Sequence, residues 1–506
     1  MENVSNKTLL GGVAKRDITN RDGSLRINDP LFVKALVLDD GKTSVAILTM
    51  DTTAIAGRTV SAGYLDDVAN DFMPKLRELV QGSLGIPSSN IMVTASHTHP
   101  PNMVKDLHCT KKIHMLCDDK SQLEKAYEAI EEAYKNMEPV LIGSGLQRED
   151  RLSMNRNIRL KNGRDASMRM WDPCPWDDEI EKLGPTDPDI GLLRVDKADG
   201  NPLAVLYNFA SHLSMGMPEG GITADFPGVA SKIIEDNMPG AMAFFLQGAA
   251  GDIAEVINKD YRHLWGAEEI GTSLGLSVLT GIRKIRSFSN SLGIVSETIE
   301  LPRRTDIPKL LETLGKEQAD LLESLIYNPL NFKSFISMYL ERMLNKEFPA
   351  NQRYRYMQEA EIGKSRLADM DAENDKYVEK YLKNILTMEK LSALRDKVFT
   401  LKKHKKVNDD SGENTIKAEV QGIKIGDCVL ITSPAELLME IGLNLKKLSK
   451  HKHTFVLPYS NGYIHYGAPA EYYKRGGYEV TECLLAPEWQ ELYEKTAERL
   501  MNRLQE

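Results

Sequence analysis

Two histidines, His97 and His99, follow an apolar, strand-like run in the segment IMVTASHTHPP at residues 91–101. Neutral imidazole is the protein ligand found most often on zinc, and strand ends that lead into loops are common places for reactive side chains. The pair therefore predicts a metal centre. Zinc takes three or four protein ligands, so the remaining ligands must come from other parts of the chain.

Four other segments place polar side chains beside predicted strand ends or glycine-rich turns. His212 follows an apolar run in NFASHLSM, and Asp252 follows the small residues of FLQGAAG, which permit close approach by a ligand or another backbone. Glu436 lies in ITSPAELLMEIG, where we expect it at the start of a helix just after a strand. Residues 461–478 are crowded with tyrosines, whose hydroxyls can ligate a metal or donate protons. Each segment also has a structural interpretation: a hydrogen-bonded core histidine, tight packing, a favourable helix start or aromatic packing.

The charge balance of the chain excludes some classes of partner. The 506 residues include 64 lysines and arginines and 73 aspartates and glutamates, for a net charge of -9. We therefore predict a small-molecule substrate, no nucleic-acid partner and no stable membrane association. The N-terminus has no signal-peptide pattern, which predicts a cytoplasmic protein, or a secreted or periplasmic one if a signal peptide has been removed.

The alternation of strand-like and helix-like segments predicts the α/β (α+β) class, with a large layered mixed sheet and surrounding helices. We expect a hairpin at residues 32–51, a helix at 66–82 with a break at Pro74, and a helix from about Ser121 with a capping box to Glu124. Residues 148–188, rich in Arg, Asp, Trp and Pro, predict a functional loop or lid rather than core.

A change of composition near Arg304 predicts three parts: a catalytic domain in two pieces, residues 1–303 and 411–506, and a helical insertion at 304–410. The insertion is rich in Leu, Glu and Lys at helical spacing, and it could cap the pocket or form a homo-oligomer interface. Its final basic run, LKKHKK at residues 401–406, predicts a solvated helix end.

Taken together and in chain order, these segments resemble a known family. They read GGVAKRDIT, ALVLDDGKTSVAILTMD, VTASHTHPP, MNRN, NFASHLSM, ITADFPGVAS, FLQGAAGDI and SPAELLMEIG, followed by the tyrosine-rich loop. This combination, from about Leu9 to Tyr478, is similar to the neutral/alkaline ceramidases, which are zinc-dependent amidases.

The resemblance implies four zinc ligands and three residues that face the substrate and take part in catalysis. The implied ligands are His97, His212, Glu436 and Tyr466. The implied catalytic and substrate-binding residues are His99, Arg156 and Tyr478. Asp51, Asp225 and Asp252 stay open between orienting a ligand histidine and capping a helix or turn.

The chain also departs from the family pattern. Ala254 stands where ceramidases have a serine, Pro100 and Pro101 follow the histidine motif in place of Ser-Gly-Pro, and no immunoglobulin-like domain is expected after Tyr478. We also find no apolar helix suited to docking on a bilayer. We therefore expect a zinc-dependent hydrolase that cleaves an amide (N-acyl) bond in a small soluble substrate by metal-activated water. The alternatives are a zinc-dependent esterase, a lyase or isomerase on a sugar-like carbonyl substrate, and a non-catalytic ligand-binding homologue.

Overall fold

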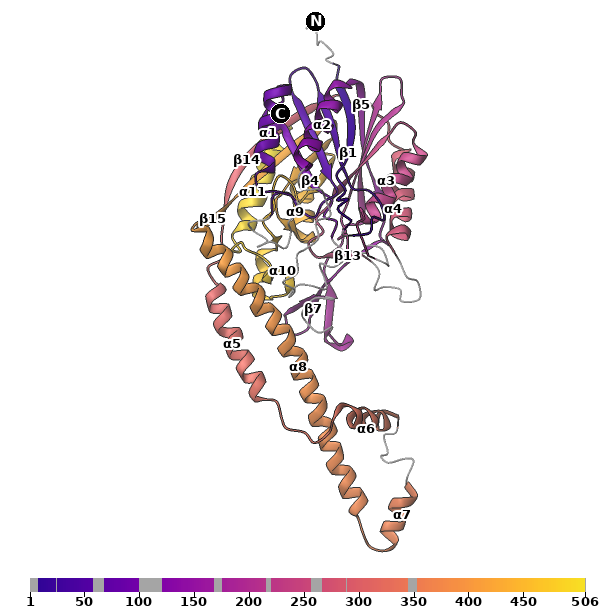
Figure 1. Ribbon diagram of the computed structural model, residues 1–506, viewed down its shortest axis with the longest axis vertical. Coiled ribbons are helices and arrows are strands. Elements are labelled where there is room, and N and C mark those ends of the chain that lie inside the picture. The colour runs from indigo at the N-terminus through magenta and orange to yellow at the C-terminus, as the bar shows by residue number, and fades with distance from the viewer. Residues whose placement is uncertain are drawn as a thin grey trace. The chain divides into compact units, whose positions relative to one another are not determined.

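Strands and helices assemble around a mixed eight-stranded sheet, which confirms the predicted α/β class (Figure 1). The computed structural model describes residues 8–23, 25–57, 68–99, 121–167, 175–214, 220–255, 266–287, 289–344 and 353–505. The sheet has the order β12 (Met242–Gln247), β11 (Pro202–Phe209), β10 (Asp189–Lys197), β5 (Glu138–Arg148), β1 (Leu10–Asp17), β2 (Phe32–Asp39), β3 (Ser44–Met50) and β4 (Ile91–Ala95). Only the outer pairs β11/β12 and β3/β4 are parallel, and β2 and β3 form the predicted antiparallel hairpin.

Strand β2 illustrates how the sequence divides the two faces of this sheet. Side chains alternate along a strand, so Val33, Ala35 and Val37 pack on one side and Leu36 and Leu38 on the other. The first face is covered by helices, and the second lies against another sheet. Burial on both faces explains why the strand is apolar except at Lys34, whose buried ammonium donates to the Ala243 carbonyl at 2.7 Å.

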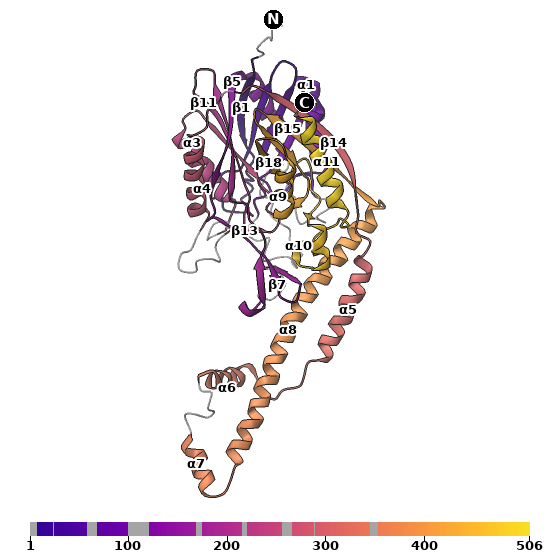
Figure 2. The same ribbon diagram turned by 180° about the vertical axis from the view of Figure 1, so that it is seen from behind.

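Helices and a second sheet form the remaining layers. Four helices cover the outer face of the large sheet: α1 (Phe72–Leu84), α2 (Gln122–Lys135), α3 (Asp225–Asn237) and α4 (Ala267–Ile282). The second sheet has the order β14 (Leu292–Pro302), β15 (Thr415–Ile425), β16 (Cys428–Thr432) and β18 (His453–Leu457). Helices α9 (Met439–Leu448) and α11 (Trp489–Arg503) pack on its far side (Figure 2).

The carboxyl ends of the two edge strands of the large sheet meet. Strands β4 and β12 lie at opposite ends of the strand order, yet the side chain of Gln247 at the end of β12 donates to the carbonyl of Ser96 just after β4, at 3.1 Å. The same amide donates to the carbonyl of Ser211, after β11, at 2.9 Å. Strong curl of the sheet therefore brings three strand ends to one place.

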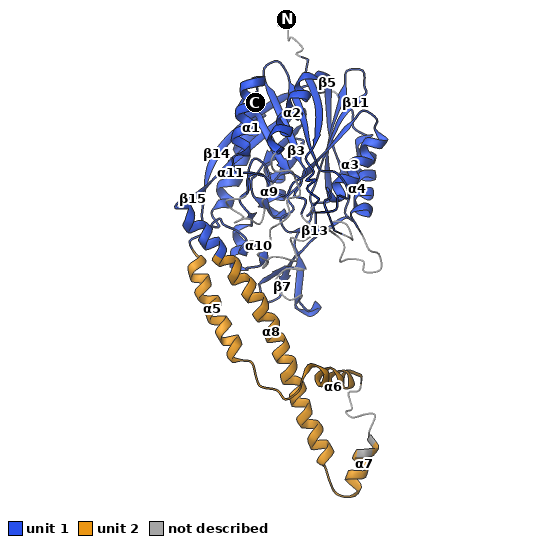
Figure 3. Ribbon diagram, viewed as in Figure 1, with its two compact units in different colours: residues 1–168, 175–305, 403–506 blue, residues 169–174, 306–402 orange. Residues whose placement is uncertain are grey.

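The chain divides into two compact units (Figure 3). Unit 1 comprises residues 1–168, 175–305 and 403–506, and unit 2 comprises residues 169–174 and 306–402. Unit 2 contains α5 (Ile307–Glu323), α6 (Phe332–Leu344), α7 (Arg353–Glu361) and most of α8 (Arg366–Ser411). The insertion boundaries predicted from composition stay a prediction.

Unit 2 exposes several apolar side chains. Helix α6 exposes Phe332, Met343 and Leu344, the last at 82%, and Tyr327 just before the helix is 87% exposed. The leucines and methionines that occur at helical spacing in unit 2 are therefore not all buried against another helix. No helix among the described residues is both long enough and apolar enough to cross a bilayer.

Three local predictions were wrong. Pro74 lies in the first turn of α1, where a missing N–H is tolerated, so it starts the helix rather than breaking it. Ser121 is the N-cap of α2 but makes no side-chain cap hydrogen bond, so the capping box does not form. The segment 148–188 is not a simple loop, because it contains β6 (Ser153–Asn155), β7 (Asn157–Leu160), β8 (Asp165–Ser167) and β9 (Ile180–Leu183). Three of these strands form a small sheet, and β6 pairs with β13 (Ile253–Glu255).

Candidate metal centre

His97 lies directly after β4 and is held in one orientation. Its backbone adopts a φ of +67°, a left-handed conformation that is rare outside glycine and is often found at functional sites. Its Nδ1 atom is 2.7 Å from the carbonyl oxygen of Thr53, and its ring stacks on Tyr459 with 4.1 Å between ring centroids. A proton on Nδ1 donated to this carbonyl leaves the lone pair of Nε2 free to bind a metal.

His212 follows the end of β11 and lies near His97, and a backbone carbonyl orients its ring in the same way. Its Nδ1 atom is 2.7 Å from the carbonyl oxygen of Ala250, and its side chain is almost fully buried. The ring centroids of His97 and His212 are 5.0 Å apart. Backbone carbonyls, rather than the aspartates considered from the sequence, therefore orient both imidazoles.

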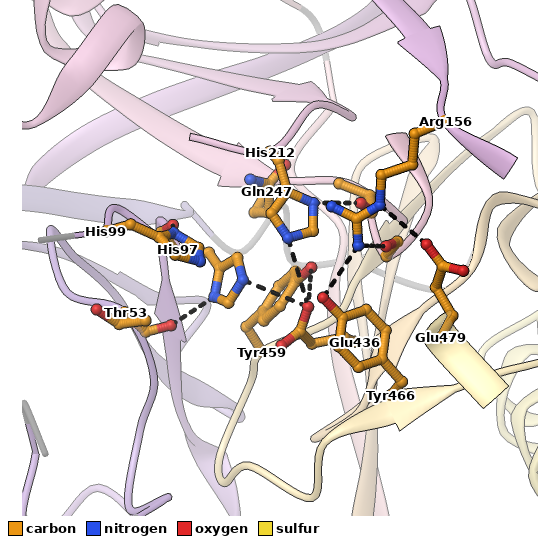
Figure 4. Close-up of polar contacts among 12 residues, drawn as sticks. Thr53, His97, His99, Arg156, His212, Gln247, Glu436, Tyr459, Tyr466 and Glu479 are labelled. Atoms are coloured by element: carbon orange, nitrogen blue, oxygen red, sulfur yellow. Dashed lines mark hydrogen bonds and ion pairs between the residues drawn. The ribbon is translucent and has the colours of Figure 1, made fainter. Parts of the chain in front are cut away.

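Glu436 lies between the two imidazoles (Figure 4). Its Oε2 atom is 3.4 Å from Nε2 of His97 and 3.6 Å from Nε2 of His212. The other carboxylate oxygen accepts a short hydrogen bond from the Tyr463 hydroxyl, and Tyr459 donates to Oε2 at 3.4 Å. Three potential ligands from distant parts of the chain thus converge on one point.

The prediction that Glu436 lies at the start of a helix was wrong. Glu436 belongs to a short strand, β17 (Glu436–Leu437), which pairs in parallel with β19 (Tyr466–Gly467), and helix α9 begins only at Met439. The backbone pairing sets Glu436 opposite Tyr466. A Cβ atom at Gly251 would lie 2.9 Å from the Glu436 carbonyl oxygen, so the small residues of FLQGAAG permit a close approach of backbones.

The protonation states of these groups suit metal binding. Burial, together with neighbouring positive groups, lowers the pKa of His212 well below its usual range and lowers the pKa of His99 to about 3. Both imidazoles are therefore neutral at neutral pH. Burial opposes ionisation of Glu436, but His97, His212 and the hydrogen bond from Tyr463 outweigh it and hold the pKa of this carboxyl well below its usual range. The result is a buried carboxylate beside neutral nitrogen donors.

Among the described residues, the buried Nε2 atom of His97 has no hydrogen-bond partner. A buried polar atom without a partner is unfavourable unless a ligand satisfies it. The donor set of two imidazoles, a carboxylate and a nearby phenol suits zinc, and the spacing of the Glu436 oxygen from the two nitrogens is close to that between neighbouring ligands of a tetrahedral ion.

His99 offers a second way to group the histidines. One ligand atom from each of His97, His99 and His212 can be chosen so that all three lie within 4.8 Å of one another. The Nδ1 atom of His99 is 2.8 Å from the carbonyl oxygen of His97, which leaves its Nε2 atom free. The geometry therefore admits His99 either as a third nitrogen ligand or as a residue that faces the substrate.

Arg156 lies beside this cluster, between β6 and β7. It is buried, and its guanidinium donates to Glu479 at 2.9 Å, to the Gly251 carbonyl at 2.7 Å and to the Tyr466 hydroxyl at 3.1 Å. The ring of Tyr478 lies 5.4 Å from the guanidinium carbon. The structure thus brings all seven predicted site residues into one region of unit 1, where Arg156 connects the two tyrosines to the rest.

Solved structures with a similar fold were found, although no protein-family model and no curated protein sequence matches this chain. Neutral ceramidase from Pseudomonas aeruginosa aligns with a TM-score of 0.60 and 14% identity, over 99% of this chain and 75% of that chain. A ceramidase complexed with C2 aligns with a TM-score of 0.59 and 14% identity, over 99% of this chain and 76% of that chain. This chain has a ceramidase-like fold. The resemblance inferred from the motifs is thereby confirmed for the fold.

Several residues of this site were not assigned a role from the sequence. Thr53 holds His97 through its backbone, and Glu479 holds Arg156. Tyr459 and Tyr463 both donate to Glu436. The tyrosine-rich loop could have indicated Tyr463, and the carboxylate beside Tyr478 could have indicated Glu479, but no sequence pattern indicates a backbone carbonyl.

The three unassigned aspartates have different surroundings. Asp252 is buried and accepts from the side chain of Asn155 and from the backbone N–H of Met439, both at 2.8 Å, which links the Arg156 segment to the start of α9. Burial raises its pKa to about 7. Asp51 accepts from the backbone N–H of Phe32 at 2.9 Å, and Asp225 is the first residue of α3. Pro100 and Pro101 lie outside the described residues.

Proposed function

We propose that this protein is a zinc-dependent hydrolase that cleaves an amide (N-acyl) bond in a small soluble substrate. The observation that carries the proposal is the position of the Glu436 carboxylate, 3.4 and 3.6 Å from the Nε2 atoms of His97 and His212, within a ceramidase-like fold. Costly buried polar groups that converge in this way are typical of a site that is used.

In this proposal the ligands are His97, His212, Glu436 and Tyr466. When bound, a zinc ion lowers the pKa of a coordinated water and polarises a carbonyl oxygen. Burial raises the pKa of Tyr466 well above its usual range, so the free protein holds this side chain as a neutral phenol. The nearby positive charge of Arg156, which donates to the Tyr466 hydroxyl, favours its ionised form.

The remaining residues have separate tasks. The Nδ1–H of His99 donates to the carbonyl of His97, so its Nε2 atom carries a lone pair that can accept a hydrogen bond from the attacking water and orient it. Arg156 keeps a permanent positive charge and can stabilise the developing oxyanion. Burial raises the pKa of Tyr478, so its hydroxyl stays protonated and can donate to the leaving amine.

Two observations bear on the alternatives. Ala254 in β13 offers no hydroxyl nucleophile, which favours direct hydrolysis by water over a covalent enzyme intermediate. The same residues could serve an ester hydrolase, or a lyase or isomerase that removes a proton beside a polarised carbonyl. A non-catalytic ligand-binding protein is the third alternative, and the complete set of proposed ligands weighs against it because costly buried polar groups are usually kept for use.

Soluble substrate, cytoplasmic location and homo-oligomerisation stay predictions. The altered residues after the histidine motif, Pro100 and Pro101, remain the reason to expect a pocket different from that of the ceramidases.

A matched substrate series tests the proposal. Compounds that share one acyl group but carry it on an amine or on an alcohol are incubated with the protein, and release of the free amine or alcohol is measured. Short N-acylated amines and amino sugars are compared with a two-chain N-acyl lipid in detergent, and proton exchange beside the carbonyl is followed by NMR. We expect amine release to dominate, with short soluble amides preferred. Preferred ester cleavage, or exchange without cleavage, would favour an alternative enzyme, and no turnover with any compound would favour a binding protein.

A further inference from the structure

A second group of metal-binding side chains lies in unit 1, apart from the residues of the proposed zinc site. It consists of His404, near the end of α8, His465, in the tyrosine-rich loop, and Glu482, directly after α10 (Tyr478–Thr481). Their ligand atoms all lie within 4.8 Å of one another. The Nε2 atom of His404 is 3.1 Å from Oε2 of Glu482, and the ring centroids of His404 and His465 are 5.1 Å apart.

This group is buried although it lies partly in the basic run LKKHKK, which we predicted to be a solvated helix end. That prediction was wrong for two of its residues, since His404 is fully buried and Leu401 is nearly so. A position three residues after a buried leucine lies on the same face of a helix, which explains why His404 points inward. The surrounding lysines obscured this periodicity in the sequence.

The hydrogen bonding of the group is incomplete within the described part of the chain. The Nδ1 atom of His404 and the Nε2 atom of His465 have no hydrogen-bond partner there, whereas the Nε2 atom of His404 faces Glu482. A buried ion-paired cluster that served only for packing would be expected to satisfy these atoms. His465 also adopts a left-handed φ of +62°, a strain that is commonly retained for a ligand or a reaction.

The carboxylate of the group is held away from water. Glu482 is buried, and its Oε2 atom faces the Nε2 atom of His404. Taking a carboxylate out of water is costly unless a positive charge pairs with it. A bound dication would supply that charge, and the two neighbouring imidazoles would add nitrogen ligands.

We propose that His404, His465 and Glu482 form a second divalent-metal site, of the kind that takes zinc. Two imidazoles and one carboxylate are a donor set that zinc accepts, and three protein ligands leave a fourth position for water. The site adjoins the first one through the backbone, because the His465 carbonyl accepts from the N–H of Glu436 at 2.9 Å and Tyr466 is the next residue. A metal here fixes the loop that supplies the tyrosine of the first site.

Anomalous diffraction from crystals of the full chain grown with zinc tests this site without any substitution. Data collected above and below the zinc absorption edge should give a peak between His404, His465 and Glu482. That peak is expected whether or not a peak appears at His97 and His212, so the inference and the proposed function can fail separately. Absence of a peak at His404 in crystals that show zinc at His97 would overturn the inference, and so would absence of both peaks.

Metal analysis of variants gives an independent test in solution. If both sites bind, His404→Gln should reduce zinc from about two equivalents per chain to about one, and it should leave the equivalent lost in His212→Ala in place. His451→Gln is the matched control, because His451 is engaged with the Met501 carbonyl at 2.8 Å and should not change the zinc content. An unchanged zinc content in a folded His404→Gln protein, checked by circular dichroism, would contradict the second site.

Discussion

The buried pair between Arg156 and Glu479 provides a quantitative test of how the site is held together. The two side chains are 6% and 1% exposed, and the Arg156 Nε atom is 2.9 Å from a Glu479 oxygen. The same oxygen accepts from the Ser167 hydroxyl at 3.2 Å. Glu479→Gln keeps the shape of the side chain and one acceptor oxygen, but it removes the negative charge that neutralises the guanidinium.

The expected effect follows from the burial of the pair. Removing one partner of a buried ion pair typically costs about 3–5 kcal/mol, because the other charge is left uncompensated. A glutamine oxygen can still accept one hydrogen bond from Arg156, and a hydrogen bond to a charged group is worth about 1.5–3 kcal/mol. We therefore expect Glu479→Gln to lower the free energy of unfolding of unit 1 by about 2 kcal/mol.

Urea denaturation followed by the fluorescence of Trp489, which is fully buried in unit 1, measures this change. Asp150→Asn is the control, because Asp150 pairs with Arg148 at 3.2 Å with side chains 58% and 67% exposed. Exposed pairs contribute about 0–1 kcal/mol, so this control should lie close to the wild type. If Glu479→Gln destabilises the protein no more than Asp150→Asn does, the reasoning about the buried pair is refuted.

Two further predictions concern Asp51 and His99. Burial raises the pKa of Asp51 from 3.8 to about 6, so the native state loses stability as pH rises from about 4 to about 6, by about 3 kcal/mol in total. Asp51→Asn keeps an acceptor for the Phe32 N–H. This variant should be more stable than the wild type at pH 7 but not at pH 3.5. Urea midpoints of the two proteins that differ equally at both pH values would contradict this. His99→Ala should keep its zinc, measured by metal analysis, while the hydrolysis rate falls by about 10²-fold, as when a reactant is misplaced. Loss of zinc with the imidazole would instead identify His99 as a ligand.

The strands of the large sheet could be predicted from the sequence because their apolar runs are long and bounded by turns. The hairpin of β2 and β3 and the strand that delivers His97 have the expected places. The local structure at Glu436 could not be predicted. Its strand β17 has only two residues and exists because Tyr466, thirty positions later, pairs with it. A local pattern carries no information about such a partner.

The meeting of His97 and His212 likewise depends on tertiary structure. Their strands β4 and β11 lie near opposite ends of the sheet order, and the curl of the sheet, the Gln247 amide and a backbone bridge between Thr98 and Leu213 join their ends. The motif resemblance grouped these residues, whereas periodicity alone could not have done so. For His404 the prediction failed for another reason. The lysines around it indicated an exposed helix end, whereas its side chain is fully buried.

The most direct test of the proposed function is the rate of amide hydrolysis by metal-free protein as zinc is added back. The chelated protein should show only background release of amine, and the rate should rise with zinc bound and level off when the His97 site is filled. His97→Ala, treated in the same way, should bind less zinc and recover no activity. Full hydrolysis by the metal-free wild type, or by His97→Ala without zinc at this site, would contradict the proposal.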